Sequence, residues 1–358
     1  MKILIVGDWH SELHEQTVFN AFKILGHEVL KFAWNDYFKS STLLGSFNKK
    51  LQNRFITGPI IHKINRDLIL VAKAFAPEMV FVYRGTHITA DTLKRIKNQN
   101  PNVTLVGYNN DDPFAKGHPY SLWRHFFKAV PNYDLMLAYR HHNLDDFLQV
   151  GAKRVELLRS WYVSERNYPV SLNNEDKIKY ECDVVFIGHY EEDGRMQYLE
   201  ELVRQGFKVR IFGPEWNPKL KNSHELNTLF PVHSVLGEDY NKALCGAKIA
   251  LCFLSKLNRD TYTRRCFEIP ATGTLMLSEY SDDLASLYVE SEELDFFRTK
   301  DELISKVKLY LGSENLRLSV ASNGYKRVIN DGHNVVSRMK QVLKWLAMVK
   351  LNEEKMRG

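Results

Sequence analysis

Two adjacent arginines, Arg264 and Arg265, precede a short apolar run that contains a single carboxylate, Glu268. A carboxylate is costly to bury unless it is hydrogen-bonded, and it can accept two neighbouring hydroxyl groups at once, as a ribose presents them. Guanidinium groups bind phosphates through forked donors. These residue types therefore suit a nucleotide-sugar site. The same side chains could instead form an ion pair near a helix start, because ion-pair networks resemble sites.

Short apolar runs recur along the chain and predict the strands of two parallel sheets, buried on both faces. They lie at 3–6, 27–32, 79–83, 103–108, 135–139, 182–188, 208–213, 248–253 and 274–278. Helical patterns alternate with them, so the fold class is α/β with two Rossmann-like βαβ domains. The first strand lacks the glycine fingerprint of a dinucleotide site, which argues against an NAD-dependent oxidoreductase.

Polar loops follow the strands of the first half, at Asp8, Arg84 and Asp111. Because ligands gather at the carboxyl ends of strands in open α/β sheets, these loops should share one edge. We interpret Asp111 and Asp112 as loop residues near an acceptor, and as candidate general bases, rather than as a metal-binding pair; no metal is predicted. Imidazole titrates near neutral pH, so histidines are also candidates for the general base. The sequence does not rank them; they are His10, His14, His87, His118, His141 and His142.

In the second half, Gly188 and Gly213 end two strands, where a loop can approach a ligand closely. They are expected to meet Ser255 and the 264–268 region at one face. The predicted domains are 1–165 and 181–333, facing each other across a cleft, with a linker at 166–180 and a C-terminal helix at 334–358. That helix either packs on the second domain or crosses back to the first.

Composition narrows the class of protein. The chain has 358 residues and a formal net charge of +6, a mild basicity without a recognisable nucleic-acid motif. It contains no run long and apolar enough for a membrane span and no secretory signal. The four cysteines lack metal-ligand spacing and suggest a reduced cytoplasmic protein. The basic segment 40–65, interrupted by apolar side chains, is either a connecting loop with a solvated helix or a surface that contacts an acceptor or a membrane.

The run Arg-Arg-x-Phe-Glu-Ile-Pro-Ala-x-Gly at 264–273 is the most specific signal in the chain. With 186–190, 212–216, Gly324-Tyr325 and His333, it makes the segment 183–339 resemble the C-terminal domain of the CgeB-like (spore-maturation-type) group 1 glycosyltransferases. The stretches 83–88 and 108–113 are similar to the partner domain of the same proteins.

The resemblance implies a GT-B fold and a sugar transfer from a UDP-, GDP- or dTDP-linked donor to a glycan, lipid-linked or protein acceptor, as in cell-surface polysaccharide synthesis. It implies no cofactor, no metal and retention of configuration. The basic segment 40–65 adds, as one alternative for this cytoplasmic protein, peripheral contact at an anionic membrane surface. Glu268 would bind the ribose. Asp260, which stands where related proteins carry Glu, would contact the transferred sugar. The diphosphate would be neutralised by Arg259, Arg264 or Arg265, and Gly273 would allow a close approach to the nucleotide.

Two alternatives use the same residues. A nucleotide-sugar epimerase of the same fold would cleave and rebuild its donor without an acceptor. A non-catalytic protein would bind the nucleotide sugar without turnover, although the intact Arg264, Arg265 and Glu268 argue against a degenerate site.

Overall fold

The computed structural model describes residues 1–39 and 43–357 and divides into two units. The first unit contains Met1–Arg159 and the segment from Val335 onward, and the second contains Ser160–Asn334. The division therefore precedes the predicted linker at 166–180. Part of that linker forms helix α7 (Asn174–Tyr180), because the Asn173 side chain accepts a hydrogen bond of 2.8 Å from the Asp176 N–H and caps the first turn.

The first unit is built on a six-stranded parallel sheet with the order β2-β1-β3-β4-β5-β6. Its strands are β1 (Lys2–Gly7), β2 (Glu28–Ala33), β3 (Met79–Tyr83), β4 (Thr104–Asn109), β5 (Leu135–Ala138) and β6 (Val155–Leu157). The five predicted strands of this half are confirmed within one or two residues. The chain leaves β1 and β3 in opposite directions along the sheet, so their loops diverge at a switch point where ligands commonly bind.

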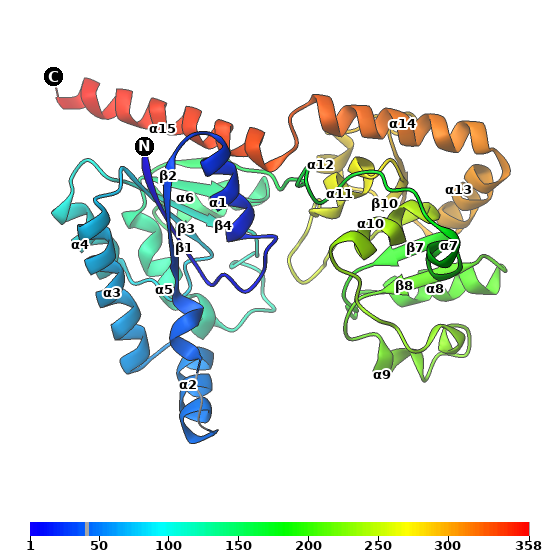
Figure 1. The fold of residues 1–358 in the computed structure, drawn as a ribbon, viewed down its shortest axis with the longest axis horizontal. Coiled ribbons are helices and arrows are strands. Elements are labelled where there is room, and N and C mark those ends of the chain that lie inside the picture. Colours follow the sequence, from blue (N-terminus) through cyan, green and yellow to red (C-terminus); the bar gives the residue numbers. More distant parts are fainter. Residues whose placement is uncertain (40–42, 358) are drawn as a thin grey trace. The chain divides into compact units, whose positions relative to one another are not determined.

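Helices cover both faces of this sheet (Figure 1). The helices of this unit are α1 (Glu15–Ile24), α2 (Leu43–Phe55), α3 (Pro59–Phe75), α4 (Ala90–Gln99), α5 (Tyr120–Ala129), α6 (His142–Gln149) and α15 (Val335–Arg357), of which α2 projects beyond the sheet in Figure 1. Apolar residues of α3, α4 and α5 pack on one face with Leu4, Val80 and Leu105. On the other side α15 packs along α1, so the C-terminal helix completes the first unit. Within the described ranges, no helix has both the length and the apolar character needed to cross a membrane.

The second unit repeats the pattern with a five-stranded parallel sheet in the order β11-β10-β9-β7-β8. Its strands are β7 (Cys182–Ile187), β8 (Val209–Phe212), β9 (Ala247–Cys252), β10 (Leu275–Glu279) and β11 (Asp295–Phe297). The loops after β7 and β9 diverge here as the loops after β1 and β3 do in the first unit. Each sheet thus has one switch point at its carboxyl edge.

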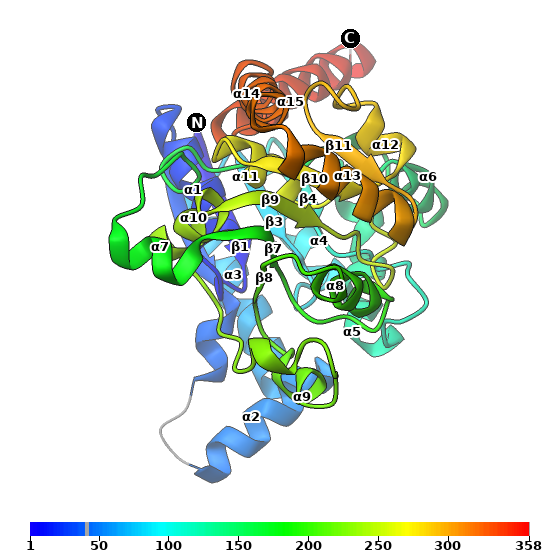
Figure 2. The same ribbon diagram turned by 90° about the vertical axis from the view of Figure 1, so that its right-hand side faces the viewer.

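Helices also lie on both faces of the second sheet (Figure 2). Besides α7, the helices of this unit are α8 (Arg195–Arg204), α9 (Asn217–Leu220), α10 (Glu238–Cys245), α11 (Arg265–Ala271), α12 (Asp282–Ala285), α13 (Lys300–Gly312) and α14 (Glu314–Asn330). The α8 and α13 helices contact each other on one face, whereas α10 and α11 contact β9 on the other. The apolar core joins these layers through residues such as Phe186, Leu199 and Val307.

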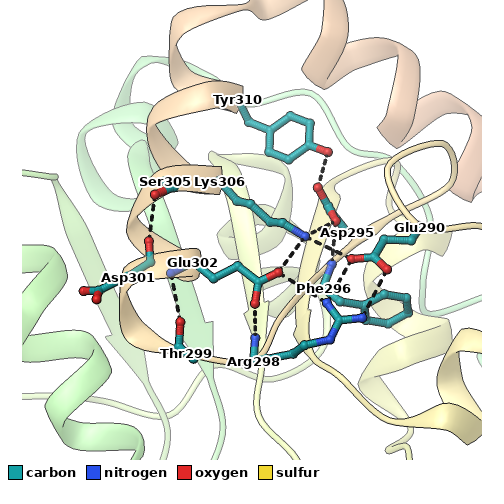
Figure 3. A network of polar contacts seen from close by, with 10 residues as sticks. All are labelled: Glu290, Asp295, Phe296, Arg298, Thr299, Asp301, Glu302, Ser305, Lys306 and Tyr310. Atoms are coloured by element: carbon teal, nitrogen blue, oxygen red, sulfur yellow. Dashed lines mark hydrogen bonds and ion pairs between the residues drawn. The ribbon is translucent and has the colours of Figure 1, made fainter.

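A polar network fixes α13 to β11 at the edge of the sheet (Figure 3). The Lys306 ammonium group lies 2.7 Å from the buried Asp295 carboxylate and 3.0 Å from Glu290. The Tyr310 hydroxyl donates a 2.6 Å hydrogen bond to the second oxygen of Asp295. Arg298 pairs with Glu290 and stacks on Tyr280, 3.8 Å from the ring centre. Because each charge in the network is paired, we assign it a structural role.

Candidate functional site

Gly188 and Gly213 follow the neighbouring strands β7 and β8, and the structure brings them into direct backbone contact. A Cβ atom on Gly213 would lie 2.1 Å from the Gly188 carbonyl oxygen, and Gly213 has a φ of +139°. The same carbonyl accepts a 2.9 Å hydrogen bond from the Trp216 indole. Only glycine allows this approach, so the two positions, which are both buried, form a close-packed glycine turn at the carboxyl edge of the sheet.

We expect Gly213→Ala to destabilise the second unit by on the order of 2–4 kcal/mol, because the added methyl group clashes with fixed backbone. Gly206→Ala is a matched control: Gly206 also has a positive φ, +86°, but an added Cβ meets no atom within 4 Å. Urea unfolding monitored by circular dichroism should show a clearly larger loss of unfolding free energy for Gly213→Ala than for Gly206→Ala. Equal losses would show that strain at positive φ, and not the contact with Gly188, limits this position.

Helix α11 carries Arg265, which lies beside this turn, and also carries Glu268. Its other side chains, Cys266, Phe267 and Ile269, are buried and fix the orientation of the helix. The Arg265 Nη1 atom lies 3.4 Å from the position that a Cβ on Gly188 would occupy. Within the described chain its Nε is buried without a hydrogen-bond partner. A guanidinium with an unused donor beside a glycine turn is suited to bind an anionic group.

Glu268 is buried and its carboxylate accepts a 2.9 Å hydrogen bond from the Tyr240 hydroxyl, which lies on α10. Burial, together with the charge of Glu268, raises the pKa of Tyr240 well above its usual value, so the hydroxyl remains a donor. Sequence reasoning missed Tyr240. No motif marks it, since it lies 28 residues away on another helix.

The Arg265 side chain lies near Glu268, Tyr240 and Cys252. Burial alone would lower its pKa, but Cys252, Tyr240 and Glu268 raise it, so the side chain remains a cation. The Cys252 thiol lies 3.6 Å from the Cys266 thiol. Its pKa falls to about 7, mainly through the hydrogen bond with Cys266 and also through Arg265. The four cysteines are free, and three of them are buried.

The other predicted donor-site residues lie elsewhere in the second unit. Arg259 and Asp260 line a cavity of about 510 Å³ at the ends of β9, β10 and β11, together with Arg298. The Arg264 guanidinium lies over the Trp161 ring, 5.9 Å from its centre.

Gly273 requires a correction. It lies beyond the far end of α11, just before β10, and lines a cavity of about 520 Å³ at the amino ends of the strands, with Cys182 and Ala247. It therefore faces away from Gly188 and Gly213, because the helix separates the two edges of the sheet. Its φ of +73° instead serves the sharp turn from α11 into β10.

At the switch point of the first unit, polar side chains surround a cavity of about 190 Å³. It is lined by Asp8, His10, His14, Glu15, Tyr83, Arg84, Asn110 and Asp111. The His10 Nδ1 atom lies 2.6 Å from the Asp8 carboxylate. Arg84, which has a φ of +65°, lies 3.7 Å from Asp8 and 3.1 Å from Asp111. The predicted residues His10 and Asp111 thus meet here.

Hydrogen bonding and burial tune the groups in this cavity. The hydrogen bond to Asp8 raises the pKa of His10. Burial would raise the pKa of Asp8, but the hydrogen bonds from His10 and the charge of Arg84 hold it below its usual value. Glu15 accepts a 3.0 Å hydrogen bond from the Asp8 N–H, and burial raises its pKa to about 7. Sequence reasoning missed Glu15, which resembles an ordinary acidic residue in the first turn of a helix.

The raised pKa of Glu15 predicts a pH-dependent stability. The native carboxyl group holds its proton up to about pH 7, whereas the unfolded one loses it near 4.5. Stability from this group is thus complete at low pH and is lost as the pH rises through 7. We expect the melting temperature of Glu15→Gln relative to the parent protein to rise between pH 5 and pH 8. A constant difference would mean that Glu15 is ionised throughout.

Asp112 points away from its neighbour Asp111 and is fully buried. The Asn143 amide donates to Asp112 at 3.0 Å and to Asp146 at 3.1 Å, and His142 lies 3.3 Å from Asp112. In the described part of the chain, Asp112, His142 and Asp146 are the group whose ligand atoms are close enough to hold a metal ion. The amide bridge already engages both carboxylates, so we interpret this group as a hydrogen-bond network and place Asp112 outside the cavity.

Another candidate base also has a structural role. The His87 ring stacks on Trp34 with centres 3.8 Å apart and hydrogen-bonds Asn53 at 2.8 Å. Burial lowers the pKa of His87 to about 3, which leaves it neutral. Of the histidines named from the sequence, His10 and His142 each lie within hydrogen-bond distance of a carboxylate. His10 makes this contact in the lining of the cavity at the switch point, as expected of a base oriented by a carboxylate.

Comparison with known proteins agrees with this architecture. The family model described as glycosyl transferase-like matches residues 195–344. No match to a curated protein was found. Sucrose-phosphate synthase from Thermosynechococcus elongatus superposes with a TM-score of 0.68 at 12% identity, covering 97% of this chain and 99% of that one. The Anabaena protein HepE, solved with UDP-glucose, gives 0.67 at 14% identity, covering 97% and 100%. A glycosyltransferase from Rickettsia africae gives 0.67 at 12% identity, covering 97% and 98%.

These likenesses show that the chain has the GT-B fold, an α/β architecture with two Rossmann-like units, as predicted. The family match confirms the predicted enzyme class, a glycosyltransferase. The CgeB-like subgroup stays a prediction.

Proposed function

We propose that the protein transfers a sugar from a nucleoside-diphosphate donor, bound by the second unit, to an acceptor hydroxyl activated in the first unit. The observation that carries the proposal is the Arg265 guanidinium, whose buried Nε has no partner in the described chain and whose Nη1 lies beside the Gly188 turn. A diphosphate supplies the missing acceptor atoms. UDP-glucose in the HepE structure supports a nucleotide sugar as the donor class.

In the proposed site, Glu268 accepts hydrogen bonds from the ribose hydroxyls while Tyr240 holds the carboxylate in place. Arg265 stabilises the charge that develops on the departing diphosphate, which is the main electrostatic demand of the reaction. This guanidinium performs the task that a divalent cation performs in other transferases, so the proposed reaction needs no metal. Arg259, Asp260 and Arg264 are proposed to contact the donor further from the ribose.

The acceptor proton has two possible destinations, which differ in stereochemistry. Retention of configuration, implied by the resemblance, lets the leaving phosphate take the proton. Inversion requires a base from the protein, and His10 with Asp8 at 2.6 Å is the observation that favours it. Proton NMR of the first product formed distinguishes the two, because the anomeric coupling reports the configuration directly.

The proposed acceptor is a glycan, lipid-linked or protein hydroxyl, as in cell-surface polysaccharide synthesis, and the proposed location is the cytoplasm. A nucleotide-sugar epimerase is the competing activity. It would convert the donor sugar with no acceptor present, and incubation of the protein with the nucleotide sugar alone tests for it.

The first experiment is a thermal-shift panel of UDP, GDP, dTDP, CMP and NAD on the parent protein and on Glu268→Ala. A ligand at about 100 times its dissociation constant adds roughly 2.7 kcal/mol of stability. A shift with one nucleoside diphosphate that disappears in the variant supports the donor site and identifies the base. No shift with any nucleotide, in a folded protein, would overturn the proposal.

A further inference from the structure

The most unusual surface of the first unit lies on helix α2. Phe47, Leu51 and Phe55 are spaced four residues apart, so they share one face of the helix. Their exposed fractions are 69%, 47% and 48%. Large apolar side chains are commonly exposed singly, but three in a row form a continuous apolar stripe, which normally marks an interaction surface.

Basic side chains flank this stripe. Lys50 and Arg54 are exposed and, at 100° per residue, lie directly beside Phe47, Leu51 and Phe55 on the helix surface. The segment 43–55 contains a third basic residue and no aspartate or glutamate. The exposed surface of α2 is therefore both apolar and cationic.

The polar side of α2 faces the rest of the unit. The Asn53 amide oxygen is hydrogen-bonded to the buried His87 ring at 2.8 Å, and the Gln52 side chain accepts a 2.9 Å hydrogen bond from the Ile60 N–H. The Arg124 guanidinium on α5 donates to the carbonyls of Phe55 at 2.8 Å and Ile56 at 2.6 Å, at the end of the helix. The usual orientation of an amphipathic surface helix is thus reversed, and hydrogen bonds hold the apolar stripe outward.

We propose that α2 docks on the surface of an anionic lipid bilayer. Phe47, Leu51 and Phe55 enter the boundary between headgroups and acyl chains, and Lys50 and Arg54 contact the lipid phosphates. Charge complementarity selects this partner, because cations without neighbouring carboxylates on the helix attract an anionic surface. Three side chains are also too small a patch for a stable protein interface, which buries about 1,000 Å² or more. The proposal does not rest on the glycosyltransferase activity.

The test is co-sedimentation of the full chain with vesicles of phosphatidylglycerol and with vesicles of phosphatidylcholine. We expect binding to phosphatidylglycerol, little to phosphatidylcholine, and weaker binding as salt rises, because salt screens the charges. The pairs Phe47→Ser with Phe55→Ser, and Lys50→Glu with Arg54→Glu, should each weaken binding by about tenfold or more.

Matched controls come from other exposed positions. Leu236 is 76% exposed in the second unit, and Lys94 and Lys340 are exposed in the first. Leu236→Ser, and Lys94→Glu with Lys340→Glu, should bind phosphatidylglycerol as the parent protein does. The proposal would be overturned if the protein bound neither vesicle, or if the test and control variants lost vesicle binding equally. The apolar stripe would then be assigned to a protein partner. Far-UV circular dichroism and melting temperatures equal to those of the parent protein establish that each variant is folded, and neither measurement depends on the donor site.

Discussion

Replacing Arg265 by alanine is expected to weaken the binding of a nucleoside diphosphate by on the order of 100-fold, because a half-buried cation that pairs with phosphate is removed. The guanidinium is surrounded by Cys252, Tyr240 and Glu268, which hold it as a cation. Within the described residues, the Arg265 Nε donor lacks a hydrogen-bond partner. A diphosphate brings two negative charges and acceptor oxygens to this donor. Turnover should fall at least as far, since the charge on the leaving diphosphate grows in the transition state. Isothermal titration with the nucleotide identified by thermal shift measures the first effect.

The neighbouring arginine supplies the comparison. Arg264 is half-buried and lies over the Trp161 ring, so Arg264→Ala should weaken binding by less than about tenfold, the range of a cation–π contact. Arg265→Lys keeps the positive charge but loses the paired N–H donors of the guanidinium, so its loss of affinity should lie between those of Arg264→Ala and Arg265→Ala. If Arg265 binds the outer phosphate, the parent protein and Arg265→Ala should bind the nucleoside monophosphate with nearly the same affinity. Equal losses for Arg264→Ala and Arg265→Ala would remove Arg265 from the proposed role.

Much of the fold was predictable because buried parallel strands consist of continuous apolar runs. Met79–Tyr83 was predicted without error, and most other strands within one or two residues. The two missed strands, β6 and β11, have three residues each and carry little periodicity. The helix α7 was mistaken for a linker, because its charged sequence is stabilised by an Asn173 cap and by packing of Tyr180 rather than by an apolar face.

The candidate site was predictable where the signal is local. Gly188 and Gly213 each end a strand, and the pairing of β7 with β8 brings them together. Tyr240 and Glu15 were not predictable, since each gains its contact only through tertiary packing. Gly273 belongs to the same sequence run as Glu268, yet the length of α11 moves it to the opposite edge of the sheet. Proximity in sequence is a poor guide once a helix intervenes.

The pair Asp111 and Asp112 illustrates the same limit. The sequence gives two adjacent carboxylates with equal claims to a role as base. In the loop their side chains diverge, so Asp111 meets Arg84 at 3.1 Å and Asp112 meets Asn143 at 3.0 Å. Neither then has the contacts of a base. The imidazole of His10 has them, because Asp8 fixes one ring nitrogen and leaves Nε2 to accept a proton.

His10→Ala is therefore expected to lower kcat by about 100-fold or more, the usual contribution of a general base. Donor binding should not change, because His10 belongs to the first unit. His62→Ala, at an exposed position of α3, is the control and should leave kcat near that of the parent protein. A loss below about tenfold would instead indicate that the leaving phosphate takes the proton, as retention requires.

The pH dependence gives a second, independent measure of the same role. A base acts in its neutral form, so kcat/KM should rise with pH through the pKa of His10, which the hydrogen bond to Asp8 raises above its ordinary value. Asp8→Asn removes the negative charge that stabilises the imidazolium, so the rise should move to lower pH while the plateau falls. A structural role for Asp8 would lower the plateau without moving the profile. A shift in this direction would therefore identify His10 as the titrating base.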